Sequence, residues 1–182
     1  MRCLLVGVSC VGKTTIGRLL ARRLGCPFFD LDEEIERHFG TSVERLRARF
    51  LTSYSYSKEV SIVLKRIVTE KDDCVIALVP SGLRDAYLRV IRKTDCVTIA
   101  LQDTPNNILR RITFYDIDSR PIVKELTEAE KALYRKEIKE DVTFFSRSYE
   151  RADLRVDISG LGAECSAEMI AGLLARRISG RT

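Results

Sequence analysis

The residues with the clearest chemistry lie near the amino terminus, in the segment 7–15, GVSCVGKTT. This segment matches the pattern G-x-x-x-x-G-K-[ST] through Gly7, Gly12, Lys13 and Thr14, and it stands between an apolar strand and an amphipathic helix. Glycines let the backbone curl so that its N–H groups face phosphate oxygens, and the helix adds the positive end of its dipole. Lys13 is expected to bind the β- and γ-phosphates, and the hydroxyl of Thr14 to bind Mg²⁺. The segment therefore predicts binding of ATP with Mg²⁺, against the alternative of a strand-to-helix turn that matches by chance.

The whole loop is expected to contact the nucleotide. Its members are Gly7, Val8, Ser9, Cys10, Val11, Gly12, Lys13, Thr14 and Thr15. Cys10 takes a position where many such loops carry glycine or another small residue. Two hypotheses follow for Cys10: modification of its thiol blocks nucleotide binding, or it is only a small side chain packed under the loop.

Two carboxylates follow the next predicted strand, in the segment 28–36, FFDLDEEIE. Asp30 and Asp32 alternate with Leu31, so both are expected above the carboxyl edge of a sheet, where open α/β sheets bind ligands. One carboxylate near Mg²⁺ and one near an attacking hydroxyl suit phosphoryl transfer to an alcohol. The alternative is that both cap the following helix, as acidic residues do, and the two roles are compatible.

Short apolar segments alternate with helical patterns along the rest of the chain. Strands are predicted at 2–8, 27–30, 74–79, 96–101 and 154–159, and helices at 14–25, 42–50, 57–70, 105–112, 128–149 and 166–178. Strands that are apolar on both faces, each followed by a helix, are typical of a parallel sheet covered on both sides. The prediction is a single three-layer α/β domain over residues 1–182, with a five-stranded parallel sheet and helices on both faces.

Composition excludes several other classes of protein. The chain has 182 residues, of which 45% are hydrophobic and 31% charged, a balance typical of a soluble globular protein. No apolar run reaches the roughly 18 residues that cross a bilayer, and no signal peptide is apparent, so we expect a cytoplasmic protein without membrane contact. A net charge of +5 without an aromatic-and-basic module does not favour nucleic acid. Six cysteines without a C-x-x-C pair, and the single histidine His38, argue against a structural metal.

Taken together, these segments resemble the shikimate kinase family of P-loop proteins. Residues 7–36 resemble the family's phosphate loop, first helix and Asp-x-Asp stretch, and residues 40–50, GTSVERLRARF, resemble its G-x-S-I-x-E-I-F segment. The pieces LRR at 109–111 and SRPIV at 119–123 resemble the family's lid, which ends in R-P-L-L, and YERADLRVD at 149–157 resembles its closing stretch. The resemblance therefore covers most of the chain and implies a P-loop kinase fold with a lid at about 112–124.

The resemblance also implies roles for particular side chains. The implied catalytic residues are Lys13, Asp32 and Arg120. Thr14 and Asp30 are the implied Mg²⁺ ligands, either directly or through water. Arg111 is implied to stack on adenine. Asp32 would meet the acceptor hydroxyl as a base or an orienting group. Arg120 would fold over the phosphates when the lid closes.

The acceptor side departs from the family pattern. Tyr56 falls where the family carries an arginine for its acceptor's carboxylate, and Phe145 falls where a second such arginine stands. The family's Gly-Gly-Gly is replaced at residues 79–81 by Val-Pro-Ser. Tyrosine and phenylalanine cannot form the bidentate contact that arginine makes with a carboxylate.

Two readings of the acceptor follow from these departures. A pocket of aromatic side chains would suit a less anionic acceptor, unless these rings are simply core packing; the rings are Tyr54, Tyr56, Phe144 and Phe145. A cation that converges from elsewhere, such as Arg84 or Arg147, would instead restore a carboxylate acceptor.

The sequence therefore predicts an ATP- and Mg²⁺-dependent, monomeric small-molecule kinase that transfers the γ-phosphoryl group to an acceptor hydroxyl. One alternative is the same fold with another acceptor, of the gluconate or nucleotide type. The other is a non-catalytic ATP-binding regulatory protein that kept the nucleotide half of the site only.

Overall fold

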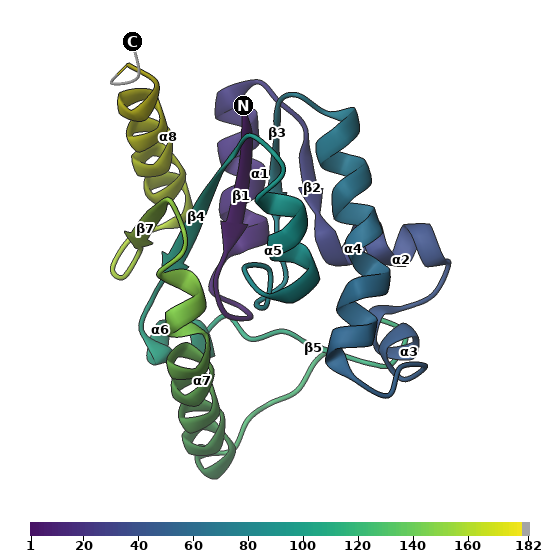
Figure 1. Ribbon diagram of the computed structural model, residues 1–182. Helices are drawn as coiled ribbons and strands as arrows, with labels where there is room; N and C mark the ends of the chain where they lie inside the picture. The colour runs from purple at the N-terminus through teal and green to yellow at the C-terminus, as the bar shows by residue number, and fades with distance from the viewer. Residues whose placement is uncertain (180–182) are drawn as a thin grey trace.

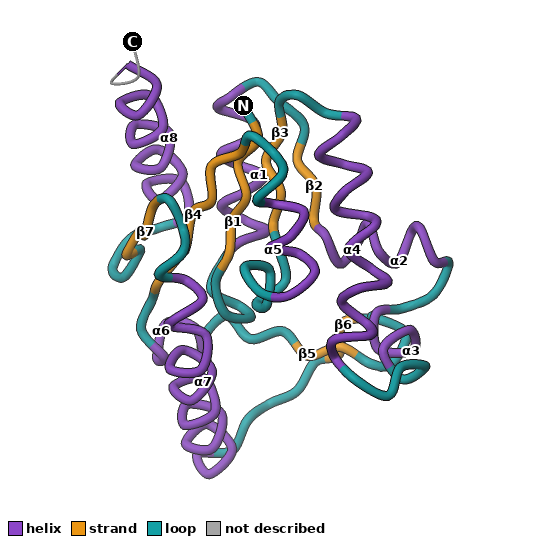
Figure 2. The backbone as a smooth tube through the Cα atoms, viewed as in Figure 1, coloured by secondary structure: helices purple, strands orange, loops and turns teal. Residues whose placement is uncertain are grey.

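Five parallel strands form the central sheet of the computed structural model, which describes residues 1–179 (Figures 1 and 2). Their order across the sheet is β2-β3-β1-β4-β7. Their bounds are Arg2–Val6 for β1, Phe28–Asp30 for β2, Cys74–Ala77 for β3, Cys96–Gln102 for β4 and Leu154–Asp157 for β7. All four pairings are parallel, which confirms the predicted sheet.

Helices cover both faces of this sheet, as predicted (Figure 1). They are α1 (Lys13–Leu24), α2 (Leu31–Phe39), α3 (Val43–Arg47), α4 (Ser53–Glu70), α5 (Asp85–Ile91), α6 (Pro105–Leu109), α7 (Glu128–Tyr149) and α8 (Ala163–Ser179). In Figure 1, α1 lies behind the sheet, where it packs with α8, and α5 lies in front, where it packs with α4. Across residues 1–179, none of the helices combines the length and the apolar character that a membrane span requires.

The register of the strands places the predicted chemistry at one edge. In β1, Val6 pairs with Ala100 of β4, and in β2, Asp30 pairs with Ala77 of β3. The carboxyl ends of these parallel strands therefore meet, and the loop after β1 lies beside the residues that follow β2.

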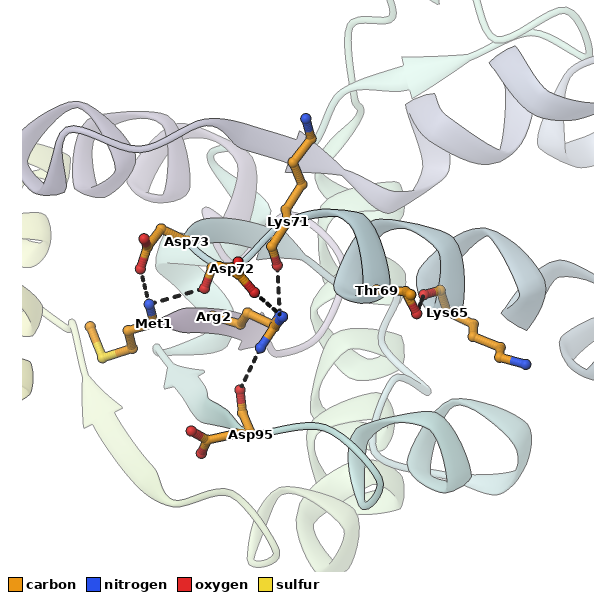
Figure 3. Close-up of polar contacts among 8 residues, drawn as sticks. All are labelled: Met1, Arg2, Lys65, Thr69, Lys71, Asp72, Asp73 and Asp95. Atoms are coloured by element: carbon orange, nitrogen blue, oxygen red, sulfur yellow. Dashed lines mark hydrogen bonds and ion pairs between the residues drawn. The ribbon is translucent and has the colours of Figure 1, made fainter.

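Charged residues anchor β1 at the opposite edge (Figure 3). The Arg2 side chain donates to the carbonyl oxygen of Lys71 at 2.6 Å, to the carboxylate of Asp72 at 2.8 Å and to the carbonyl oxygen of Asp95 at 3.5 Å. The amino group of Met1 donates to the carbonyl oxygen of Asp72 at 3.0 Å. These contacts tie the start of β1 to the segments that lead into β3 and β4.

Two of the differences between these helices and the prediction have local reasons. Helix α4 begins at Ser53, four residues earlier than expected, because the Thr52 hydroxyl accepts from the backbone N–H of Ser55 and caps it. Helix α5 was not predicted at all. It is seven residues long, and the spacing of its buried residues Ala86, Tyr87 and Ile91 was its only signal.

A close contact between α1 and β2 gives a stability prediction. A Cβ atom at Gly17 would lie 2.5 Å from the ring of Phe28 and 3.2 Å from Leu5. We expect Gly17→Ala to lower the free energy of unfolding by about 1 to 3 kcal/mol, because the added methyl overpacks this interface. Urea denaturation measures the change.

Gly172, in the interior of α8, is the matched control. A Cβ atom there meets nothing within 4 Å. Gly172→Ala is expected to raise stability by about 0.5 to 1 kcal/mol through helix propensity alone. An equal gain for Gly17→Ala would show that the α1–β2 contact is not as tight as described.

Candidate active site

The loop between β1 and α1 has the backbone that a phosphate loop requires. Gly7 has φ of +153° and Gly12 has φ of +113°, in a region that favours glycine. A Cβ atom at Gly7 would also lie 2.8 Å from the side chain of Val11 and 2.9 Å from the carbonyl oxygen of Leu101. Both glycines of the sequence pattern are therefore needed for the shape of the loop.

The side chain of Lys13 is folded onto this loop. Its Nζ donates to the carbonyl oxygens of Gly7 at 3.0 Å and Val8 at 2.9 Å. Burial lowers the pKa of Lys13 to about 8, although the carboxylates of Asp32 and Asp30 oppose the shift. The ammonium group thus contacts the loop carbonyls, and the charges of the two predicted carboxylates favour its protonated form.

Cys10 has φ of +58°, in the left-handed region that glycine adopts without strain. Its side chain is half-buried and packs against the hydrophobic core. This packing agrees with the hypothesis of a small side chain under the loop. The effect of modifying the thiol stays a prediction.

The two predicted Mg²⁺ ligands lie in direct contact. The Thr14 hydroxyl donates to Asp30 Oδ2 at 2.6 Å, and Asp30 Oδ1 accepts from the backbone N–H of Asp32 at 3.1 Å. Asp30 is therefore the cap of α2, and it also contacts Thr14 of the phosphate loop; its role towards Mg²⁺ stays a prediction. A hydroxyl and a carboxylate are hard oxygen donors that suit Mg²⁺, which keeps its other positions for water and phosphate.

Asp32 lies in the first turn of α2, exposed to solvent yet surrounded by charged neighbours. The surrounding protein removes water that would solvate the charged carboxylate, and this loss of solvation raises the pKa of Asp32 to about 6. The negative charge of Asp30 adds to the increase, whereas the positive charges of Lys13 and Arg47 oppose it. A carboxylate with this pKa is ionised at neutral pH and is basic enough to accept a proton.

Arg111, predicted to stack on adenine, lies beside the phosphate loop. Its Nη1 is 3.9 Å from the position of a Cβ atom at Gly12. Its other terminal nitrogen pairs with Asp103, whose side chain is almost fully buried and also accepts from Asn107 Nδ2 at 2.7 Å. The sequence reasoning missed Asp103, although its place directly after β4, at the same edge as Asp30, was a usable signal.

The predicted lid, residues 112–124, contains a short antiparallel hairpin of β5 (Phe114–Tyr115) and β6 (Pro121–Ile122). Its tip is docked on the end of α2 and on α3. The Ser42 hydroxyl donates to the carbonyl oxygen of Ile117, Arg45 Nε donates to Asp118 at 2.6 Å, and Ser119 contacts Glu36. Arg120 is exposed on this hairpin, and no contact described within residues 1–179 joins its side chain to the phosphate loop.

The aromatic residues expected to line an acceptor pocket do not gather in one cluster. Tyr54 contacts Arg89, whereas Tyr56 contacts Phe50 with ring centroids 5.8 Å apart. Phe144 and Phe145 contact each other on α7.

The α7 aromatics pack towards the segment that replaces the three glycines. Phe145 stacks on Tyr149, whose hydroxyl donates to the carbonyl oxygen of Pro80 at 3.1 Å. Arg84 lies over the ring of Phe144, at 4.9 Å from its centroid. Arg147, the other arginine considered for the acceptor, is exposed.

Three features meet at the carboxyl edge of the parallel sheet: a phosphate loop with two glycines at positive φ, a hydroxyl–carboxylate pair and a basic carboxylate. Together they define a P-loop phosphotransferase. The family model for shikimate kinase matches residues 9–170. The chain therefore belongs to the shikimate kinase family, and it is an ATP-dependent kinase whose acceptor is a hydroxyl group of a small molecule.

Individual relatives agree with this assignment. The chain is 30% identical over 179 residues to a shikimate kinase of Thermodesulfovibrio yellowstonii, covering 98% of this chain and 97% of that one. The solved shikimate kinase of Bacteroides thetaiotaomicron has a TM-score of 0.78 at 22% identity, covering 96% of this chain and 98% of that one. That of Acinetobacter baumannii in complex with shikimate has a TM-score of 0.75 at 23% identity, covering 97% and 93%. At these identities, the two structures show the likeness of the fold.

The raised pKa of Asp32 gives a prediction on stability. Between its usual value of 3.8 and about 6, the folded chain keeps a proton that the unfolded chain has lost, so stability falls as pH rises through this window. Asp32→Asn removes this loss. The variant is therefore expected to be more stable than the wild type at pH 7, and the difference should vanish below about pH 4.

Denaturant unfolding between pH 3.5 and 8 measures this dependence. Glu33→Gln, in the same turn of α2, shows the effect of losing a negative charge at a helix amino terminus together with the exposed ion pair of Glu33 with Arg18. An Asp32→Asn variant that is no more stable than the wild type at pH 7 would contradict the prediction.

Proposed function

We propose that this kinase phosphorylates a hydroxyl group of shikimate, with ATP and Mg²⁺. The observation that carries the proposal is the contact of 2.6 Å between the Thr14 hydroxyl and the carboxylate of Asp30. The backbone N–H of Asp32, in the first turn of α2, donates to the same carboxylate. Family membership supports the acceptor, since the relatives matched over nearly their whole length are named as shikimate kinases. We also propose that the chain acts as a monomeric single domain in the cytoplasm, which suits ATP as a substrate and cysteines that are all free in the described part of the chain.

In this proposal the nucleotide is held by the backbone of the loop, residues 7–15, and by the side chain of Arg111. Lys13 binds the β- and γ-phosphates, exchanging the carbonyl oxygens of Gly7 and Val8 for phosphate oxygens. Thr14 and Asp30 would hold Mg²⁺, which would neutralise charge on the phosphates.

The acceptor is activated by Asp32. Its carboxylate accepts the proton of the attacking hydroxyl as the bond to the γ-phosphorus forms and the bond to the β-phosphate oxygen breaks. Arg120 approaches the phosphates from the lid hairpin and stabilises the charge that develops there, while the closed lid excludes water.

Variants of Lys13 and Asp32 separate binding from chemistry. Lys13→Ala is expected to abolish both ATP binding and transfer, because the buried cation for the phosphates is lost. Asp32→Asn is expected to leave ATP affinity within about twofold and to lower kcat by about 10² to 10⁴, the usual contribution of a general base. ATP binding is measured by calorimetry and transfer by coupled release of ADP. Turnover left intact by Asp32→Asn would remove that residue from catalysis.

An acceptor panel tests the substrate. In the same coupled assay the wild type is expected to release ADP with shikimate and not with gluconate or nucleoside monophosphates. Transfer to one of those instead would identify a kinase of the same fold with a different acceptor. Tight ATP binding with no transfer to any acceptor would favour a regulatory nucleotide-binding protein.

A further inference from the structure

A cation and an aromatic ring face each other across α3 and α4, close to Asp32. The guanidinium of Arg47, the last residue of α3, lies over the ring of Tyr56, at 5.3 Å from its centroid. Tyr56 stands where the family pattern has an arginine. Arg47 stands where the G-x-S-I-x-E-I-F pattern has its final phenylalanine. Relative to the family pattern, an aromatic residue and an arginine have therefore exchanged positions between α3 and α4, and in this structure the two side chains are in contact.

The charge of Arg47 is available to a ligand. Within residues 1–179 its guanidinium has no described hydrogen bond or ion pair, and the side chain is exposed. Arg45, two residues earlier, is instead engaged with Asp118 of the lid hairpin. Arg47 acts on Asp32 as well, since its charge favours the ionised form of that carboxylate. It thus lies near the group that meets the acceptor hydroxyl.

Two buried phenol groups at the same place also lack partners. The hydroxyl oxygens of Tyr56 and Tyr87 are buried, and neither has a hydrogen-bond partner within the described part of the chain. A buried hydroxyl without a partner costs about 1 to 3 kcal/mol, so a ligand or water is expected to bind there. Burial raises the pKa of Tyr56 to about 12 and that of Tyr87 further, so both remain hydrogen-bond donors at neutral pH. Asp32 and Arg47 are close enough to act electrostatically on the pKa of both phenols, and Glu36 and Glu44 act on that of Tyr56.

We propose that Arg47 is a specificity-determining residue that binds a carboxylate of the acceptor, with the hydroxyl groups of Tyr56 and Tyr87 as additional donors. The acceptor is then a hydroxy acid: its hydroxyl meets Asp32 and its carboxylate meets Arg47. This inference rests on the proposed function and supplies what that function lacks, a cation in place of the missing arginines. Of the two readings of the acceptor drawn from the sequence, it favours the cation that converges from elsewhere, with Arg47 in place of Arg84 or Arg147.

The test compares shikimate with its carboxamide, which keeps the ring and the hydroxyls but carries no negative charge. Arg47→Gln is expected to raise KM for shikimate by about 10- to 100-fold, the range for a hydrogen bond to a charged group, and to remove the preference for shikimate over the amide. KM for ATP should change by less than about twofold. Arg47→Lys keeps the charge but loses the bidentate contact, so an intermediate KM is expected.

Arg49→Gln is the matched control, because Arg49 is an exposed arginine just after α3 with no described contact to Tyr56 or Asp32. It should leave both KM values unchanged. Tyr56→Phe is a second, conservative variant. It should weaken shikimate binding several-fold without loss of stability, because the hydroxyl that it removes is unpartnered in the free chain.

Two outcomes would overturn the inference: an equal rise in KM for the acid and the amide, or no change for shikimate with Arg47→Gln. Calorimetry of shikimate binding separates this inference from the proposed function. If the wild type binds shikimate without transferring phosphate, and Arg47→Gln abolishes that binding, the inference stands and the proposed function fails. If the wild type binds no shikimate, with or without ATP, the inference fails.

Discussion

The buried ammonium group of Lys13 is the constraint on which the rest of the site depends. A cation with so little solvent needs oxygen atoms or negative charge around it. Lys13 contacts the loop carbonyls of Gly7 and Val8, and the charges of Asp30 and Asp32 favour its protonated form. The loop can present its carbonyls only because Gly7 and Gly12 adopt their unusual φ values. The carboxylates are in place only because β2 ends beside β3, at the same edge as β1. The position of the Lys13 charge therefore depends on both the order of the strands and the shape of the loop.

The nucleotide half of the site depends mainly on backbone groups, whereas the acceptor half depends on side chains. The nucleotide half consists mostly of backbone, so its recognition depends on two glycines and a helix terminus and survives much sequence change. The acceptor half that we propose consists of side chains from α2, α3, α4 and α5. There a tyrosine on α4 and an arginine on α3 stand where the family pattern has an arginine and a phenylalanine, and the fold is kept. Resemblance to the family is therefore strong in the first half and broken in the second.

This division also explains how far the sequence could be read. Each feature that could be predicted depends on residues close together in the sequence, at a recognisable spacing. These features are the phosphate loop, the pair Asp30 and Asp32, and the five strands. The contacts from Arg47 to Tyr56 and from Arg111 to Asp103 could not be predicted, because each joins residues whose spacing carries no pattern. An alignment by position finds a tyrosine in place of an arginine. Only the fold shows that another arginine lies over its ring.

Helix α3 connects the acceptor half to the lid. The hydroxyl of Ser42 accepts from the backbone N–H of Arg45 at 3.3 Å, which caps the helix, and it also donates to the carbonyl oxygen of Ile117 in the lid hairpin. Arg45 then pairs with Asp118, so two adjacent residues of the hairpin tip are attached to the start of α3. Arg47 ends the same five-residue helix, in which Leu46 is the only buried side chain. The residue that we propose to bind the acceptor and the residues that hold the lid hairpin therefore lie on the same short helix and its cap.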